Sequence, residues 1–118
     1  MEAIVNTLKG YLSMDTEIEF SEFQDYFKEI IDYLGKNYQD LEEGQLLQFR
    51  YILNTVDANA DARAARKDGN MKKYRKIADK CKFWSNAIKL KLSNEFGYDQ
   101  DKLEEADARI DEAMRPEA

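Results

Sequence analysis

The strongest constraint on the fold is a hydrophobic repeat of three and four residues that occupies the middle of the chain. It runs from Leu46 to Ala60, pauses at the tripeptide "DGN" (68–70), and resumes at Met71 as far as Leu92. This spacing places apolar side chains along one side of an α-helix. The sequence therefore predicts two long amphipathic helices joined by a short turn.

Shorter repeats of the same kind flank this pair. The single proline, Pro116, stands near the end of the chain, so proline bars no earlier position from a helix. Strand-like alternation is confined to "TEIEF" (16–20), which is too short to build a sheet. We expect five helices, over about 2–13, 22–34, 41–68, 71–96 and 102–113.

Helix boundaries are suggested by capping residues. Three segments match the capping-box pattern, in which a polar N-cap is followed three residues later by Glu or Gln: Ser21–Gln24, Asp40–Glu43 and Asp101–Glu104. Asn70 is the expected N-cap of the fourth helix. Gly35 and Gly97 are the expected residues after the second and fourth helices, because glycine adopts the left-handed conformation that ends many helices.

These patterns predict an all-α protein, a four- or five-helix bundle built around a long antiparallel hairpin (about 41–68 and 71–96), with 1–118 forming a single helical domain. A short turn makes neighbouring helices antiparallel. Each hairpin helix would be roughly 40 Å long at 1.5 Å per residue. A second helix of about 13 residues cannot cover that length alone. Either the three shorter helices all pack along the hairpin, or part of it is open to a partner, which could be a second copy in a homodimer.

The stretch "VDANADARAARKDGN" (56–70) has two interpretations. Asp57, Asn59 and Asp61 alternate like the first ligands of a calcium loop. However, Ala62 occupies the sixth position, where such a loop needs glycine, and Arg63 places a cation at the seventh. The surrounding alanines and the continuing repeat favour helix. We therefore predict neither a metal site nor a cofactor.

Composition excludes several kinds of catalysis. The chain has no histidine, which removes histidine general bases, Ser-His and Cys-His pairs, and histidine-bound zinc. Cys81 is the single cysteine, and its place on the apolar stripe predicts a buried thiol. No apolar run resembles a signal peptide or a membrane span, so we expect a cytoplasmic protein with no membrane association.

Charge is strongly segregated along the chain. Residues 62–91 hold 11 Lys and Arg against two Asp, whereas residues 1–61 hold four basic residues and 13 acidic ones. One interpretation is that the basic segment packs beside the acidic helices. The others are that it meets an acidic protein partner, or an anionic ligand such as nucleic acid, whose phosphates its cations would bind.

The candidate site follows from this basic segment and its aromatic residues. Tyr74 and Trp84 lie on the apolar stripe, so core positions are expected for both, whereas Phe83 lies beside the stripe and is expected at the surface. The predicted partner- or anion-binding residues are Arg63, Arg66, Lys67, Lys72, Lys73, Arg75, Lys76 and Phe83.

Three functions are carried forward from these residues. The first is a non-catalytic regulatory, adaptor or inhibitor protein that acts through protein–protein contact; its acidic helices could also imitate nucleic-acid phosphates. The alternative is a nucleic-acid- or nucleotide-binding module that uses the basic hairpin tip (63–91). The third is a carboxylate–metal phosphohydrolase, because "EEAD" (104–107) resembles one of the paired E-x-x-[ED] motifs of helical nucleotide pyrophosphatases, although a second motif is missing.

Overall fold

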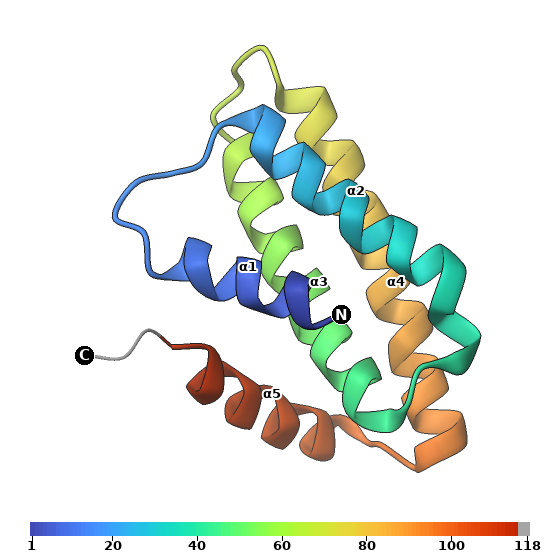
Figure 1. Ribbon diagram of the computed structural model, residues 1–118. Helices are drawn as coiled ribbons and strands as arrows, with labels where there is room; N and C mark the ends of the chain where they lie inside the picture. Colours follow the sequence, from blue (N-terminus) through green and yellow to red (C-terminus); the bar gives the residue numbers. More distant parts are fainter. Residues whose placement is uncertain (116–118) are drawn as a thin grey trace.

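The computed structural model describes residues 1–115, which form helices joined by short connections. Within that range there are five α-helices, one short 3-10 helix and no β-strand. The elements are α1 (Glu2–Leu12), α2 (Phe20–Asn37), η1 (Tyr38–Asp40), α3 (Glu43–Ala64), α4 (Met71–Phe96) and α5 (Gln100–Met114). The predicted all-α class, a helical bundle built on a long hairpin, is confirmed (Figure 1).

The hairpin consists of α3 and α4, which form the most extensive helix–helix contact of the molecule. They contain 22 and 26 residues. The turn between them is longer than predicted, because α3 ends at Ala64 and leaves 65–70 as the connection. Lys67 reverses the chain with φ of 56°, and Asp68 Oδ1 accepts the backbone N–H of Asn70 at 2.8 Å.

The predicted length of the second helix is wrong. α2 has 18 residues and continues through Gly35 to Asn37, where η1 follows. A Cβ atom at Gly35 would meet nothing within 4 Å, so the packing there does not require glycine. Figure 1 shows α2 running along the hairpin. It reaches α4 through Phe23, whose ring lies 5.4 Å from that of Tyr74, and the hairpin is covered further than its sequence suggests.

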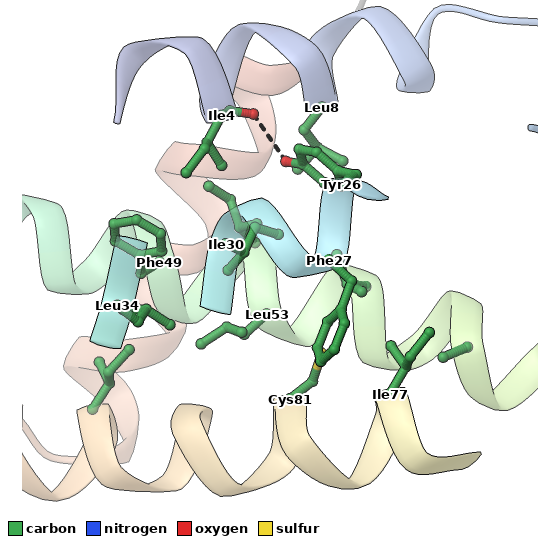
Figure 2. Close-up of a cluster of buried hydrophobic side chains, with 14 of the residues drawn as sticks. Ile4, Leu8, Tyr26, Phe27, Ile30, Leu34, Phe49, Leu53, Ile77 and Cys81 are labelled. Atoms are coloured by element: carbon green, nitrogen blue, oxygen red, sulfur yellow. Dashed lines mark hydrogen bonds between the residues drawn. The ribbon is translucent and has the colours of Figure 1, made fainter. Parts of the chain in front are cut away.

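The core is a single cluster of apolar side chains drawn from all five α-helices. Ile30 and Leu34 of α2, Phe49 and Leu53 of α3, and Cys81 of α4 are fully buried at its centre (Figure 2). The predicted burial of Cys81 is thereby confirmed, and Phe49 and Leu53 show that the repeat from Leu46 to Ala60 faces the core. Nowhere in the described part of the chain is a helix both long and apolar enough to cross a membrane.

The short helices α1 and α5 are fixed to the larger ones by polar contacts as well as by apolar burial. The Tyr26 hydroxyl donates to the carbonyl oxygen of Ile4 at 2.9 Å, which joins α2 to α1 (Figure 2). Arg50 Nη1 donates to both carboxylate oxygens of Asp107, at 2.9 and 2.7 Å, and so joins α3 to α5.

The predicted capping boxes lie about two residues from the true helix starts. The N-caps are Glu19, Glu42 and Asp99, rather than Ser21, Asp40 and Asp101. Each region holds several polar residues able to cap, so packing of the first buried turn decides which one does. Asn70 is the N-cap of α4 as predicted, though without a side-chain hydrogen bond. Gly97 ends α4 with φ of 70°, which confirms that prediction.

Candidate functional site

α4 has two unlike faces. Its inner face carries the buried residues Tyr74, Ile77, Ala78, Cys81, Ile88 and Leu92. At 100° per residue, the positions on the opposite side point away from the bundle. We call this surface the outer face of α4, and it consists of Lys72, Arg75, Lys76, Asp79, Lys80, Phe83, Asn86, Ala87 and Leu90.

The second half of the outer face is apolar. Phe83 is 67% exposed and Leu90 is 54% exposed, and the two lie seven residues apart, about 10 Å along the helix. Trp84, expected in the core, is half-buried beside them: its ring meets Phe83 edge-on at 5.8 Å and Tyr38 at 5.4 Å. The Tyr38 hydroxyl donates to the carbonyl oxygen of Ala87 at 3.2 Å. The exposed Phe83 ring therefore packs against Trp84, which is itself held in place by Tyr38.

The first half of the outer face is basic. Among residues 1–115, four of its exposed cations have no carboxylate oxygen within 4.0 Å: Lys72, Arg75, Lys76 and Lys80. Lys82 behaves differently, because its Nζ contacts Asp57 at 2.6 Å and Asp61 at 3.0 Å, and hydrogen bonds to both carboxylates raise its pKa. The fold neutralises Lys82, whereas the outer face keeps four cations against the single carboxylate of Asp79 and so a net positive charge.

Two predicted site residues turn away from this face. Arg63 is only 6% exposed, and its Nη1 donates to the carbonyl oxygen of Ile18 at 3.1 Å and to the Tyr74 hydroxyl at 3.2 Å. Arg66 makes a two-point ion pair with Glu17, at 2.6 and 2.5 Å. These two arginines hold the segment between α1 and α2, so here the basic chain does pack beside an acidic one.

The remaining predicted residues lie at the edges of the outer face. Lys67 is exposed in the 65–70 connection. Lys73 is exposed too, but its Nζ lies 5.4 Å above the ring of Phe20, which directs it toward α2. The structure thus brings Lys72, Arg75 and Lys76 together on the outer face, with Lys73 at its edge, and separates them from Arg63 and Arg66.

An open groove of about 780 Å³ separates α4 from α2. On α4 it is lined by Lys73, Lys76 and Lys80, and on α2 by Asp25, Glu29 and Asp32 together with Lys28, so the α2 edge has a net negative charge. No ion pair within 4.0 Å crosses it between described residues. Carboxylates therefore border the basic half of the outer face along one side.

The carboxylates considered as metal ligands have other partners. Asp57 and Asp61 belong to α3, which confirms the helical interpretation of that stretch, and both contact Lys82. Asp107 is bound by Arg50. In the range 1–115, no three His, Cys, Asp or Glu side chains are grouped to hold a metal ion.

Cys81 is placed where its thiol is unreactive. The residue is fully buried, and burial, assisted by Asp57, raises the pKa of the thiol to about 12. A thiol is nucleophilic as the thiolate, so a protonated buried one is a structural residue. The prediction of a core cysteine is confirmed.

Sequence reasoning missed Leu90 and Lys80 as members of the outer face. The signal was present, because Leu90 lies two helical turns after Phe83 and, like it, falls outside the repeat that contains Ile88 and Leu92. Comparisons of the chain with protein-family models, with curated proteins and with solved structures found no match.

Proposed function

We propose that the protein is a non-catalytic regulatory, adaptor or inhibitor protein whose outer α4 face docks an acidic segment of another protein. The observation that carries this proposal is the pairing of two exposed apolar side chains, Phe83 and Leu90, with cations that have no partner in the described chain. Such a face exposes apolar side chains to water and carries cations without a partner. One ligand could bury the first and pair with the second.

The apolar half supplies the affinity. Burying a Phe or Leu side chain is worth about 1.5–3 kcal/mol each relative to leaving it exposed. Aromatic anchors surrounded by smaller contacts are typical of binding hot spots. Phe83 lies on a long helix and against Trp84. Little ordering of the backbone is therefore needed when a partner binds.

The basic half supplies selectivity for an acidic partner. Cations at an interface accelerate encounter with an oppositely charged surface and disfavour basic ones. The two-turn spacing of Phe83 and Leu90 matches the i, i+7 anchors of a helix laid against another helix. The partner that fits this face is an amphipathic helix with apolar residues on one side and Asp or Glu toward one end.

Nucleic acid is the alternative ligand for the same surface. Lys76 and Lys80 could contact phosphates while Phe83 stacks on a base. Against this, Asp25 and Asp32 border the lysines across the groove, and the chain carries a net charge of -6. Both features repel a phosphate backbone. An acidic protein segment meets the same repulsion, but it can carry a few carboxylates at one end only, over the cations, whereas a phosphate backbone is charged along its whole length. We therefore favour a protein partner.

The test is quantitative affinity capture from the native host with matched variants. We expect Phe83→Ser combined with Leu90→Ser to lose the partner, because its apolar anchors are gone. Met14→Ser is the control, since Met14 is 45% exposed outside the outer face. A partner lost by the double variant but kept by Met14→Ser, and released by about 0.5 M salt, supports the proposal.

Three results would contradict it. One is a set of captured proteins unchanged by the double variant. Another is a captured species that is destroyed by nuclease, which would favour nucleic acid. The third is self-association in light scattering that the double variant abolishes, because the occupant of the face would then be a second copy of the chain.

A further inference from the structure

A second cavity lies away from the outer face of α4, between α1, the segment 13–19, α2 and α3. Its volume is about 210 Å³, and its walls include Leu8, Tyr11, Phe23 and Val56. At about 30 Å³ per water molecule in the liquid, this is space for roughly seven waters. A cavity of this size suits a small organic molecule with an apolar body.

One charged side chain of this cavity is buried. Arg63 lines it and is 6% exposed, with its guanidinium carbon 4.5 Å from the ring centre of Phe23. Both of its hydrogen bonds to described residues come from Nη1, to the carbonyl oxygen of Ile18 and the hydroxyl of Tyr74. Nε and Nη2 donate no hydrogen bond to an atom of residues 1–115. These two N–H groups form the fork that binds a carboxylate in a bidentate way.

The nearest carboxylate does not fill this fork. Glu17 Oε1 lies 3.8 Å from Arg63 Nε, beyond hydrogen-bonding distance, because Arg66 holds both oxygens of Glu17 at 2.6 and 2.5 Å. The hydrogen bond from Arg66 lowers the pKa of Glu17, so its carboxylate stays ionised near neutral pH. One carboxylate is thus shared by two guanidinium groups, and the more buried of them has the poorer contact.

We propose that this cavity binds a small monocarboxylate with a compact apolar body, whose carboxylate occupies the Nε–Nη2 fork of Arg63. The apolar part of the ligand lies against Leu8, Phe23 and Val56. The ligand leaves the Arg66–Glu17 pair in place and supplies the hydrogen bonds that Arg63 lacks. This site is independent of the binding face on α4.

The chemistry of the walls favours a carboxylate over a phosphate. A phosphate monoester carries up to two negative charges, and Glu17 would repel the second one at close range. A monocarboxylate matches a single guanidinium fork in charge and in shape. The apolar lining favours binding of an aromatic ring or a short branched chain, and it does not stabilise a bare inorganic ion.

The first test uses the wild-type protein and two probes of the same shape, benzoate and the uncharged benzamide. Backbone amide signals are followed by NMR during titration. We expect benzoate to shift the signals of Ile18, Val56 and Arg63 with a Kd of about 1 mM, a plausible strength for nine non-hydrogen atoms. Benzamide should bind at least about tenfold more weakly, because it has no charge for Arg63 to meet. Equal shifts with benzamide would show an apolar cavity without carboxylate recognition and would overturn the proposal, as would inorganic phosphate binding as tightly as benzoate.

Two variants then test the roles of the residues. Glu17→Gln removes the nearby negative charge and should tighten benzoate binding by about three- to tenfold. Glu22→Gln is its control, because it changes the net charge equally on the exposed surface of α2, and Glu22 forms no ion pair within the described chain.

Arg63→Lys keeps the charge but loses the fork, and it should weaken benzoate binding by about tenfold or more. A thermal melt shows whether that variant is folded; if it is not, the benzoate–benzamide comparison and the Glu17→Gln result still decide. Equal benzoate affinity in wild type, Glu17→Gln and Glu22→Gln would contradict the proposed place of the carboxylate.

Discussion

The inner and outer faces of α4 belong to the same 26-residue helix but are specified by different demands. On the inner face, Cys81, Ile88 and Leu92 are fully buried against α2 and α3. On the outer face, Phe83 and Leu90 are more than half exposed. Apolar residues on one helix therefore need not all serve the core: those at the helical angle of the buried set stabilise the fold, whereas those on the opposite side stay exposed to solvent.

The charged residues of the hairpin divide in the same way. Arg50 of α3 has a side chain only 11% exposed and is matched by Asp107 at 2.7 Å. The cations of the outer face have no such partner among residues 1–115. A buried guanidinium without a carboxylate is costly, whereas an exposed lysine is solvated by water. The fold therefore requires a partner for a charge inside the bundle but not for a charge on the outer face.

The largest difference in stability between the two faces is expected from truncating one side chain on each face, at positions two residues apart. Ile88→Ala should lower the free energy of unfolding by about 2–5 kcal/mol, because it opens a cavity in a fully packed core. Leu90→Ala should change it by less than about 0.5 kcal/mol, because Leu90 is mostly exposed. Urea unfolding followed by circular dichroism measures both. Similar losses for the two variants would mean that the outer face is covered, for example by a second copy.

A smaller change in stability is expected from removing one carboxylate that pairs inside the bundle and, for comparison, one on the exposed side of α4. Asp107→Ala leaves Arg50 without its partner and should destabilise the protein by about 2 kcal/mol. Asp79→Ala, on the exposed side of α4, should stay within about 0.5 kcal/mol of wild type. Thermal melts at one pH and salt concentration compare them. Addition of Arg50→Met to Asp107→Ala should recover part of the loss, because the uncompensated charge is then gone.

The inner face was predictable from sequence because its cause is local. The three-four repeat that contains Tyr74 and Cys81 can be satisfied only by one helix face, and Gly97 ends the helix through its own backbone preference. The hairpin and the all-α class follow from the same repeat. Phe83 was predicted at the surface by its offset from that repeat.

The parts that were missed depend on contacts distant in sequence. α3 ends before Lys67 while Arg63 is drawn to Ile18, 45 residues away along the chain, and no local pattern reports that contact. The same arginine was predicted as a surface residue because arginines usually are. Trp84 fits the repeat, but its angle places it at the rim, where Tyr38 meets it. Only the packing of separate elements distinguishes these cases.

The smallest effect is expected from the ion pair between Glu17 and Arg66. Its exposure lies between that of the buried Arg50–Asp107 pair and that of the unpaired cations of the outer face, because the Glu17 side chain is 45% exposed. The hydrogen bond from Arg66 lowers the pKa of Glu17 below the usual value of about 4.3. A lowered pKa in the folded state stabilises the protein above the unfolded-state pKa, and that contribution is lost as the pH falls through the folded-state value.

Wild type should therefore melt about 2 °C above Glu17→Gln at pH 7, a difference limited by solvent screening. The difference should shrink as the pH falls below the unfolded-state pKa and through the lowered folded-state pKa of Glu17. Carboxylates common to both proteins largely cancel in this comparison, and 1 M salt should also shrink the difference at pH 7. A melting difference that persisted unchanged at low pH would show that Glu17 acts through packing of the 13–19 segment and not through its charge.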